Sequence, residues 1–214
     1  MSKEILINVN RMETRAAVLE GGRLVELHVE RESNQRVAGN IYKGRVVNVL
    51  PGMQAAFVDI GLEKNAFLYV DDLGGYLHHA EEENEAVVPL RPQSINEILK
   101  EGQEIIVQVT KDPIGTKGAR VVTHLSIPGR YVVLMPTVEY VGISRRIDDP
   151  QERERLKVLA RKIRPRNAGL IVRTAAEGED EEELKRDLRF LLRTWDKIRH
   201  RARKLPAPAL LYKD

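Results

Sequence analysis

The sequence has no cysteine among its 214 residues. This absence excludes disulfides, thiolate zinc sites and cysteine nucleophiles within them. No apolar run approaches the roughly 18–20 residues that a membrane-spanning helix requires. The start, Met1 to Glu4, leads into a mixed strand instead of the apolar core of a signal peptide. We therefore expect a cytoplasmic protein with no membrane segment.

The sequence also has little excess of charge of one sign. The formal net charge is only +3, which by itself is too small to indicate a polyanionic partner. The chain does have 42% apolar residues, which are enough to supply the cores of one large domain or two small ones.

The stretch from Asn40 to Tyr69 is the most informative part of the sequence. Turn signals separate short runs rich in β-branched and aromatic residues, which are Ile41–Leu50, Ala55–Ile60 and Ala66–Tyr69. This spacing is typical of a barrel or a sandwich. Aromatic residues punctuate the runs and cations lie beside them: Tyr42, Phe57, Phe67 and Tyr69, with Lys43, Arg45 and Lys64. The rings could stack on bases in an OB-type barrel that binds single strands, although aromatics on short strands more often form core.

The residues before this stretch predict a β-meander. Strands are expected at Ile5–Val9, Arg15–Leu19 and Leu24–Val29, and Gly21-Gly22 suits the tight hairpin between the last two. Such a sheet has an apolar face that must be covered. The next segment, Arg31–Gly39, is polar and leads directly into the barrel, so the pattern favours a barrel inserted into another domain.

The segment Tyr76–Gln93 is expected to form an exposed acidic loop, whose charge would repel a polyanion. It contains His78 and His79, which have no further ligands at metal-binding spacing, so solvated loop residues are the better interpretation.

A short helical turn should follow this loop, with Ser94 as its N-cap and Glu97 completing a capping box. Runs at Glu104–Thr110 and Arg120–Leu125 then predict the strands that close the barrel, which spans residues 39–126.

The last part of the chain predicts an α/β module. Strands are expected at Tyr131–Met135 and Val141–Ser144, followed by a helix with Asp149 at its N-cap and Pro150 at its first position.

A short apolar strand, Gly169–Val172, then delivers Arg173 and Thr174 to a loop. A forked guanidinium beside a hydroxyl suits a terminal phosphate, although Arg-Thr pairs are also common by chance.

A long helix is expected from about Asp180 to Lys204. Its apolar stripe, which we assign to the core, consists of Leu184, Leu188, Leu191, Trp195 and Ile198. Acidic residues in its first turn and basic residues near its end suit the helix dipole, which explains the basic cluster without a nucleic acid.

The sequence motifs of the barrel stretch resemble those of one bacterial family. IYKGRV, AAFVDIG and AFLYVDDL are similar to the S1-type RNA-binding barrel of the ribonuclease E/G family. The resemblance implies that Phe57 and Phe67 contact single-stranded RNA, and we add Lys43 as a candidate phosphate contact. It also implies an RNA contact for Lys117, for which a solvated turn lysine is an equal alternative.

The later motifs GISRRI, GLIVRTAAEG and IPGRYVVLMP resemble the family's 5′-sensor, the pocket that recognises the 5′-monophosphate end of RNA. The resemblance assigns Arg173 and Thr174 to the phosphate, Gly129 and Val133 to the terminal nucleotide, and Arg145 to a supporting role. The RTAAEG wording is closest to the ribonuclease G branch of the family.

The resemblance implies an α+β fold, mainly β, in which the barrel interrupts a ribonuclease-H-like domain. Residues 1–38 would be the first strands of that domain, 39–126 the S1-type barrel, 127–204 the 5′-sensor, and 205–214 the point where the ribonuclease-H-like domain resumes.

In this family a magnesium ion held by two aspartates in a later domain cuts RNA, and cysteines of a zinc-linked interface support the dimer. We therefore nominate no catalytic residue and no metal ligand here, and expect no cleavage by these residues alone. Asp71-Asp72 and Asp148-Asp149 suit solvated turns and caps better than two-metal chemistry. The chain is expected to be the RNA-binding front half of an endoribonuclease, homo-oligomeric only at full length. The alternative is a freestanding RNA-binding adaptor, and the gene sequence after residue 214 would decide between them.

Overall fold

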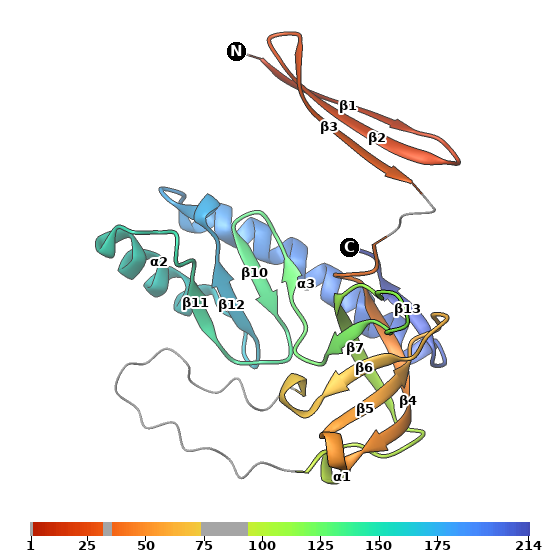
Figure 1. The fold of residues 1–214 in the computed structure, drawn as a ribbon. Helices are drawn as coiled ribbons and strands as arrows, with labels where there is room; N and C mark the ends of the chain where they lie inside the picture. The colour runs from red at the N-terminus through yellow and green to blue at the C-terminus, as the bar shows by residue number, and fades with distance from the viewer. Residues whose placement is uncertain (1, 32–35, 74–93) are drawn as a thin grey trace. The chain divides into compact units, whose positions relative to one another are not determined.

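The computed structural model describes residues 2–31, 36–73 and 94–214. They divide into two compact units, residues 1–37 and residues 38–214 (Figure 1). The acidic loop predicted at residues 76–93, with His78 and His79, lies outside the described residues.

The first unit is the predicted antiparallel meander of β1 (Lys3–Val9), β2 (Glu13–Glu20) and β3 (Arg23–Arg31). Gly21 and Gly22 form its hairpin turn with φ of +58° and +79°, values that favour glycine at both positions. Every side chain of β1 and β3 is exposed, apolar ones included. A three-stranded sheet of this kind needs a cover for its apolar face, and its ribonuclease-H-like identity stays a prediction.

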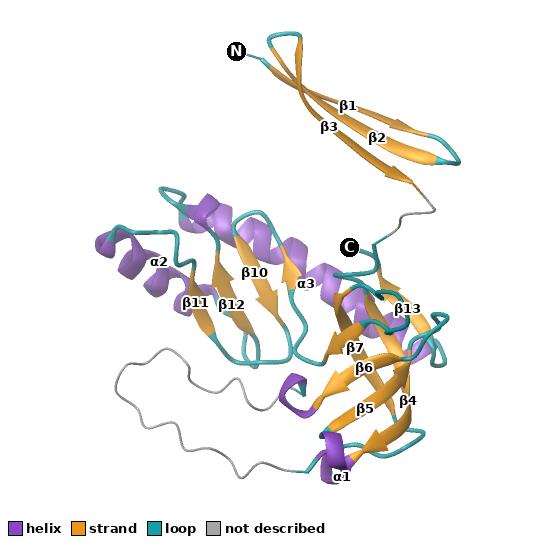
Figure 2. Cartoon of the chain, viewed as in Figure 1, coloured by secondary structure: helices purple, strands orange, loops and turns teal. Residues whose placement is uncertain are grey.

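The second unit contains a closed five-stranded barrel (Figure 2). Its strands are β4 (Ile41–Leu50), β5 (Ala55–Asp59), β6 (Ala66–Tyr69), β7 (Glu104–Lys111) and β8 (Arg120–Val122). The order is β4-β5-β6-β8-β7, and β7 returns to pair with β4. All pairs are antiparallel except β6 with β8. This closed five-stranded connectivity is that of an OB-type barrel.

Alternation along the strands fills the barrel interior. The inward residues are aliphatic and almost inaccessible: Val46, Ala56, Val58, Leu68, Val107, Val109 and Val121 are at most 1% exposed.

A short helix, α1 (Ile95–Ile98), packs near β4. The prediction that Ser94 and Glu97 form a capping box at its start is wrong. Ser94 makes no side-chain cap. Instead the Oε1 atom of Gln54 accepts the N–H of Ile95 at 3.0 Å, and its Nε2 atom donates to the Ser94 hydroxyl at 3.3 Å. Gln54 follows the 3-10 turn η2 (Pro51–Met53) in a left-handed conformation, so the cap comes from a distant turn that the local motif cannot reveal.

A second sheet follows the barrel in the order β11 (Val141–Ile143), β12 (Gly169–Val172), β10 (Val132–Met135), β9 (Ile127–Pro128). Helices α2 (Pro150–Ile163) and α3 (Glu181–Lys204) pack on it. The predicted N-cap of α2 is confirmed, because Asp149 accepts the N–H of Gln151 at 3.0 Å. The structure adds a cap to α3, where Asp180 accepts the N–H of Glu183 at 2.9 Å.

The core of this module continues into the barrel. The predicted stripe on α3 is buried at its leucines and Ile198, and Trp195 is partly buried against the same cluster. That cluster also contains Ile41 of β4 and Leu125 at the barrel's end. The core of the second sheet therefore extends to the end of the barrel, through Ile41 and Leu125.

The last strand, β13 (Ala209–Tyr212), pairs antiparallel with β4 and adds a sixth strand to the barrel sheet. Residues 205–214 were expected to resume a ribonuclease-H-like sheet. In this structure β13 uses the part of β4 near Lys43 and Tyr42, which is not paired with β5.

Candidate nucleic-acid interface

The outer face of β5 and β6 carries three aromatic rings, which we call the aromatic ladder (Phe57, Phe67 and Tyr69). Phe57 lies directly opposite Phe67, with ring centroids 5.5 Å apart at an interplanar angle of 72°. The centroids of Phe67 and Tyr69 are 4.4 Å apart at 75°. The intervening residues Ala56 and Leu68 are fully buried, so alternation puts the rings on the outside of the barrel. Oligonucleotides bind OB-folds on the face of these second and third strands.

An arginine closes one end of the aromatic ladder. The Cζ atom of Arg120, on β8, lies 5.4 Å from the centroid of Tyr69. Its Nε and Nη2 atoms donate to the two carboxylate oxygens of Asp72 at 2.9 and 3.1 Å. The prediction that Asp72 is a solvated turn residue is wrong, because it is 8% exposed and pairs with an arginine far along the chain. This forked pair fixes the guanidinium beside the rings.

Lys117 lies in the turn between β7 and β8, with its side chain exposed. Backbone hydrogen bonds with Ile114, at 3.0 and 3.1 Å, shape that turn. The Nζ atom of Lys64 donates to the carbonyl of Gly115 at 2.5 Å and holds the loop before β6 against it. Strand β8 begins just after this turn and pairs with β6 at Phe67, so the turn that carries Lys117 lies near the start of β6.

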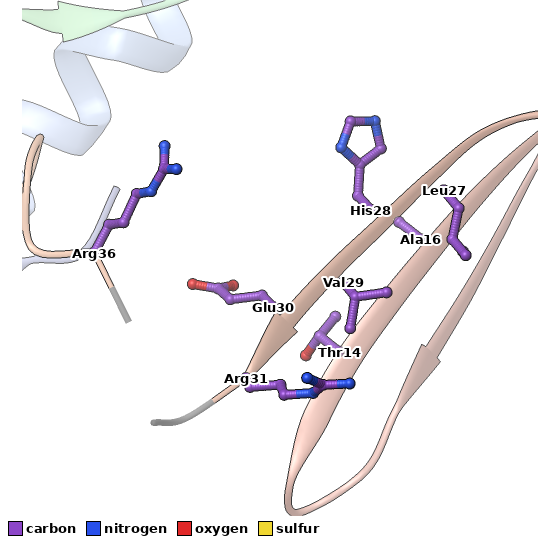
Figure 3. Close-up of a pocket in the computed structure, with 8 residues that line it drawn as sticks. All are labelled: Thr14, Ala16, Leu27, His28, Val29, Glu30, Arg31 and Arg36. Carbon is purple, nitrogen blue, oxygen red and sulfur yellow. The ribbon is translucent and has the colours of Figure 1, made fainter. Parts of the chain in front are cut away.

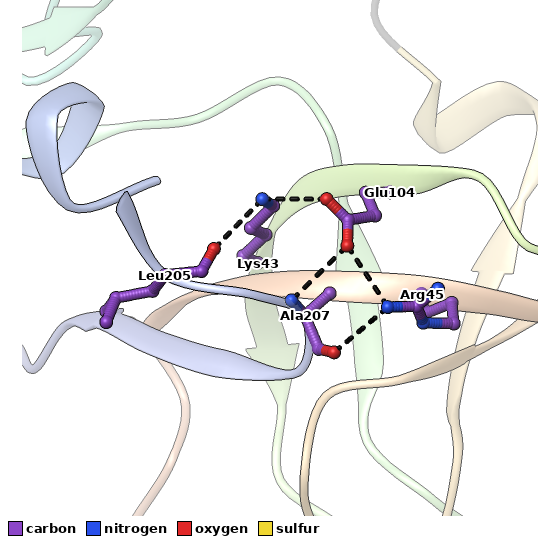
Figure 4. A network of polar contacts seen from close by, with 5 residues as sticks. All are labelled: Lys43, Arg45, Glu104, Leu205 and Ala207. Atoms are coloured by element: carbon purple, nitrogen blue, oxygen red, sulfur yellow. Dashed lines mark hydrogen bonds and ion pairs between the residues drawn. The ribbon is translucent and has the colours of Figure 1, made fainter. Parts of the chain in front are cut away.

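Lys43 lies elsewhere, on the stretch of β4 that pairs with β7 and β13. Its Nζ atom is 2.7 Å from the carboxylate of Glu104 and donates to the carbonyl of Leu205 at 3.0 Å (Figure 4). The side chain is only 16% exposed. Arg45 joins the network through Glu104 at 3.1 Å and the carbonyl of Ala207 at 3.2 Å. Lys43 thus fastens the segment after α3 to the barrel, and its contact with RNA stays a prediction.

This network also affects the carboxylate at its centre. The hydrogen bond from Lys43, followed by that from the N–H of Ala207, lowers the pKa of Glu104 from its ordinary value. The carboxylate is therefore held in its charged form between two cations and a backbone donor.

Four of the five residues predicted for the 5′ end lie at one end of the second sheet, which we call the sheet edge, and Val133 lies on β10 close to it. Arg173 and Thr174 leave the end of β12, and Arg145 follows the end of β11, which runs parallel to β12. Gly129 precedes the start of β10, which runs antiparallel to β12. These strand ends therefore bring residues from three separate motifs together.

Contacts within this edge are direct. The Nη1 atom of Arg173 donates to the carbonyl of Gly129 at 2.5 Å, and its backbone N–H donates to the carbonyl of Tyr131 at 2.8 Å. Val133 is opposite Ile171, and both are half-buried on the face that alternates with the fully buried Val132 and Leu170. The guanidinium of Arg173 is exposed. The edge thus offers a held but accessible arginine beside an apolar strand surface.

The loop after Thr174 is anchored by a pair of residues on α2. Arg155 donates to both carboxylate oxygens of Glu152 at 2.6 and 2.7 Å, and to the carbonyl of Glu179 at 3.0 Å. Glu152 in turn accepts the N–H of Gly178 at 2.9 Å. The hydrogen bonds from Arg155, then that from Gly178, lower the pKa of Glu152 to about 2. The loop that carries Thr174 is therefore tied to α2 by a carboxylate that stays charged.

Sequence reasoning missed one acceptor at this edge. Asp187 on α3 accepts the N–H groups of Arg130, Tyr131 and Val132 at 3.2, 2.7 and 3.0 Å. The available signal was its helical position, three residues after Leu184 and four before Leu191, which puts a carboxylate on the buried face.

Other features offer less. A hollow on the three-stranded sheet of the first unit is lined by residues such as Ala16, Leu27 and Val29, with His28 beside them (Figure 3); His28 pairs with Glu26 at 3.0 Å. Residues 2–31, 36–73 and 94–214 contain no group of three or more His, Asp or Glu that could hold a metal ion. Within the same ranges no helix is long and apolar enough to cross a membrane.

The barrel and its aromatic ladder place the second unit in the class of OB-type folds. Comparisons with known proteins then give a family. Residues 126–214 match the model of the ribonuclease E/G family. The chain is 47% identical to ribonuclease G of Haemophilus influenzae over 209 residues, which is 98% of this chain and 42% of that protein.

Two further relatives agree. Ribonuclease G of Escherichia coli strain K12 is 47% identical over 212 residues, 99% of this chain and 43% of that protein. Ribonuclease E of Nostoc is 45% identical over 204 residues, 93% of this chain and 27% of that protein. These matches confirm the predicted resemblance: the chain is similar to ribonuclease G and ribonuclease E proteins along nearly its whole length. It spans about two fifths of the length of the ribonuclease G proteins.

Proposed function

We propose that this chain is the RNA-binding portion of an endoribonuclease of the E/G type, which binds single-stranded RNA on the barrel and the 5′-monophosphate end at Arg173. The observation that carries the proposal is the convergence of Gly129, Arg145 and Arg173 at one sheet edge, in the same compact unit as the aromatic ladder. Cleavage is assigned to the part of the relatives that this chain does not span.

On the barrel, the rings of Phe57 and Phe67 would stack on successive bases, each worth ~1–3 kcal/mol. Lys117 would contact the phosphates, and Arg120 would add a cation beside Tyr69. Stacking reads no particular sequence, because every base has a π-face. The substrate class is therefore single-stranded RNA without strong base preference.

At the sheet edge, Arg173 spends one N–H on the carbonyl of Gly129 and keeps others for a phosphate. A guanidinium has five N–H donors in a fixed fork, so anchoring one of them aims the rest. The hydroxyl of Thr174 can add a further donor, and Val133 offers an apolar surface to the terminal base. Each hydrogen bond to a charged group is worth ~1.5–3 kcal/mol before ordering losses, so a preference of about tenfold for a monophosphate end is expected.

Two RNAs test the two surfaces separately. A ten-nucleotide RNA with a 5′-hydroxyl reports the barrel, and a trinucleotide with a 5′-monophosphate reports the sheet edge. Phe57→Ala and Phe67→Ala should each weaken the longer RNA about 5- to 100-fold, which corresponds to one lost stacking contact. Arg173→Lys should weaken only the phosphorylated trinucleotide, because lysine keeps the charge and loses the fork.

Fluorescence anisotropy measures the affinities, and circular dichroism checks that each variant is folded. If Phe57→Ala and Phe67→Ala bind the ten-nucleotide RNA as the unsubstituted chain does, the aromatic ladder is not the RNA platform. If they lose their fold, the rings are structural.

A further inference from the structure

The turn before β10 is organised by one carboxylate. Asp187 accepts three consecutive backbone N–H groups, from Arg130, Tyr131 and Val132, at 3.2, 2.7 and 3.0 Å. The N–H of Gly129 donates to the carbonyl of Val132 at 2.8 Å and closes the turn. Hydrogen bonds to a charged acceptor are stronger than neutral ones, so this carboxylate fixes the course of the backbone from residue 129 to 132.

The carboxylate of Asp187 also explains why glycine suits position 129. A Cβ atom on Gly129 would lie 2.5 Å from the Oδ2 atom of Asp187 and 2.6 Å from its Oδ1 atom. Such distances are too short for any side chain. The absence of a side chain at this position therefore makes room for the carboxylate, whatever else Gly129 contacts.

This turn holds Arg173, the arginine of the proposed 5′-end site. The carbonyl of Gly129 accepts from the guanidinium of Arg173, and the carbonyl of Tyr131 accepts from its backbone N–H. A chain of direct contacts thus runs from Asp187 through the turn to Arg173. Both anchors of Arg173 on this turn lie within the segment that Asp187 fixes.

We propose that Asp187 is a positioning residue for 5′-phosphate recognition, a role that rests on the proposed function of Arg173. Without the carboxylate, three N–H groups lose their acceptor and the turn relaxes. The carbonyl of Gly129 then no longer holds the guanidinium, and the fork loses its aim. Asp187 itself does not touch the phosphate.

The direction in which the affinity for the monophosphate changes, when the charge of Asp187 is removed, distinguishes a positioning role from a purely electrostatic one. A negative charge near a phosphate repels it, so removing the charge of Asp187 by electrostatics alone would strengthen binding of the monophosphate. Positioning predicts the opposite result, because the aim of Arg173 is lost when the turn relaxes. Asp187→Asn keeps the size of the side chain, removes the charge and replaces one of the two accepting oxygens by an NH2 group, which cannot accept a backbone N–H.

Asp196 provides a matched control on the same helix. Its carboxylate is largely exposed and pairs with Arg199, one turn further along. Asp196→Asn therefore makes the same change of charge on α3 without touching the turn. Any effect that the two substitutions share is electrostatic or general to the helix.

The experiment titrates the 214-residue chain and both variants with trinucleotides that carry a 5′-monophosphate or a 5′-hydroxyl, and with a ten-nucleotide 5′-hydroxyl RNA. For Asp187→Asn we expect the preference for the monophosphate to fall from about tenfold to about twofold or less, with the affinity for the longer RNA unchanged. Asp196→Asn should keep the full preference. Thermal unfolding of each variant confirms that it is folded at the temperature of the titration.

The outcomes are distinguishable. If the unsubstituted chain shows no preference between the two ends, the proposed function itself fails. If it shows the preference and Asp187→Asn retains or increases it, the positioning role is overturned while the 5′-end site stands. A loss of affinity for all three RNAs in Asp187→Asn would also overturn it, because that pattern marks a purely structural residue.

Discussion

At the scale of single residues, two lysines with the same predicted role have different surroundings. Lys117 is exposed in the turn before β8, whereas Lys43 is bound by Glu104 and the carbonyl of Leu205. An exposed lysine can contact a phosphate without losing other partners. A lysine already held by a carboxylate would have to break that pair first.

Substitution of each lysine by alanine separates the two roles. Lys117→Ala should weaken RNA binding and reduce the slope of log affinity against log salt by about one, with the melting temperature unchanged. Lys43→Ala should lower the melting temperature by about 2–4 °C, as expected for a loss of about 1 kcal/mol in a chain of this size. Equal losses of RNA affinity in both variants, with unchanged melting temperatures, would restore Lys43 to the RNA surface.

The sequence predicts which element carries a candidate residue better than it predicts which distant residue that candidate contacts. The spacing predicts that Phe57 and Phe67 lie on short strands, while their assignment to RNA, like that of Arg173 to the 5′ end, rests on the resemblance of their motifs to a known family. Arg120 pairs with Asp72, and Asp187 with the turn at Tyr131, only because the fold brings distant segments together. No local pattern contains that information.

At the scale of elements, helix ends are predicted most reliably where the cap is local. Asp149 caps α2 as its sequence predicts, and Asp180, the residue at which α3 is expected to begin, caps α3 in the structure. The cap of α1 fails as a prediction because Gln54, in a turn of the barrel, takes the place of a local side chain. Caps from distant segments depend on tertiary structure, which periodicity does not describe.

The link between α2 and the loop that carries Thr174 gives a pH-dependent prediction. The pKa of Glu152 in the folded chain is lowered to about 2 by Arg155 and the N–H of Gly178. A lowered pKa in the folded state contributes stability above the ordinary pKa of glutamate, and this contribution is lost as the pH falls from about 4.5 towards 2. Glu152→Gln removes the contribution at every pH.

Melting temperatures of the unsubstituted chain and of Glu152→Gln should therefore differ by about 2–4 °C at pH 7, for an interaction of about 1 kcal/mol at a partly exposed pair. The difference should narrow as the pH drops below about 4.5. Glu154→Gln, an exposed glutamate on the same helix, is the matched control and should change little. A difference that stays constant down to pH 3 would contradict the role assigned to Glu152.

At the scale of the whole chain, the barrel and the second sheet act as one body because they share a core through Ile41, Leu125 and Leu211. The strand β13 strengthens this union by pairing with β4 after α3 has crossed the sheet. The periodicity of the sequence predicts each module separately. Because the two modules share a core, no linker-like pattern separates them at residues 126 and 127.

This union has a functional consequence under the proposal. An RNA whose 5′ end lies at Arg173 and an RNA that lies on the aromatic ladder would bind surfaces of the same compact unit. In a longer RNA, strong binding to the barrel would mask the contribution of the 5′ end. Recognition of the end must therefore be measured with RNAs of a few nucleotides.

The most direct test is a titration of the unsubstituted chain with three matched trinucleotides that differ only in their 5′ ends. The monophosphate should bind about tenfold more tightly than the hydroxyl, because only it engages the fork of Arg173. The triphosphate should bind less tightly than the monophosphate, because Arg173 and Thr174 present donors for a single phosphate. Equal affinities for all three ends would contradict the assignment of this sheet edge to the 5′ end of RNA.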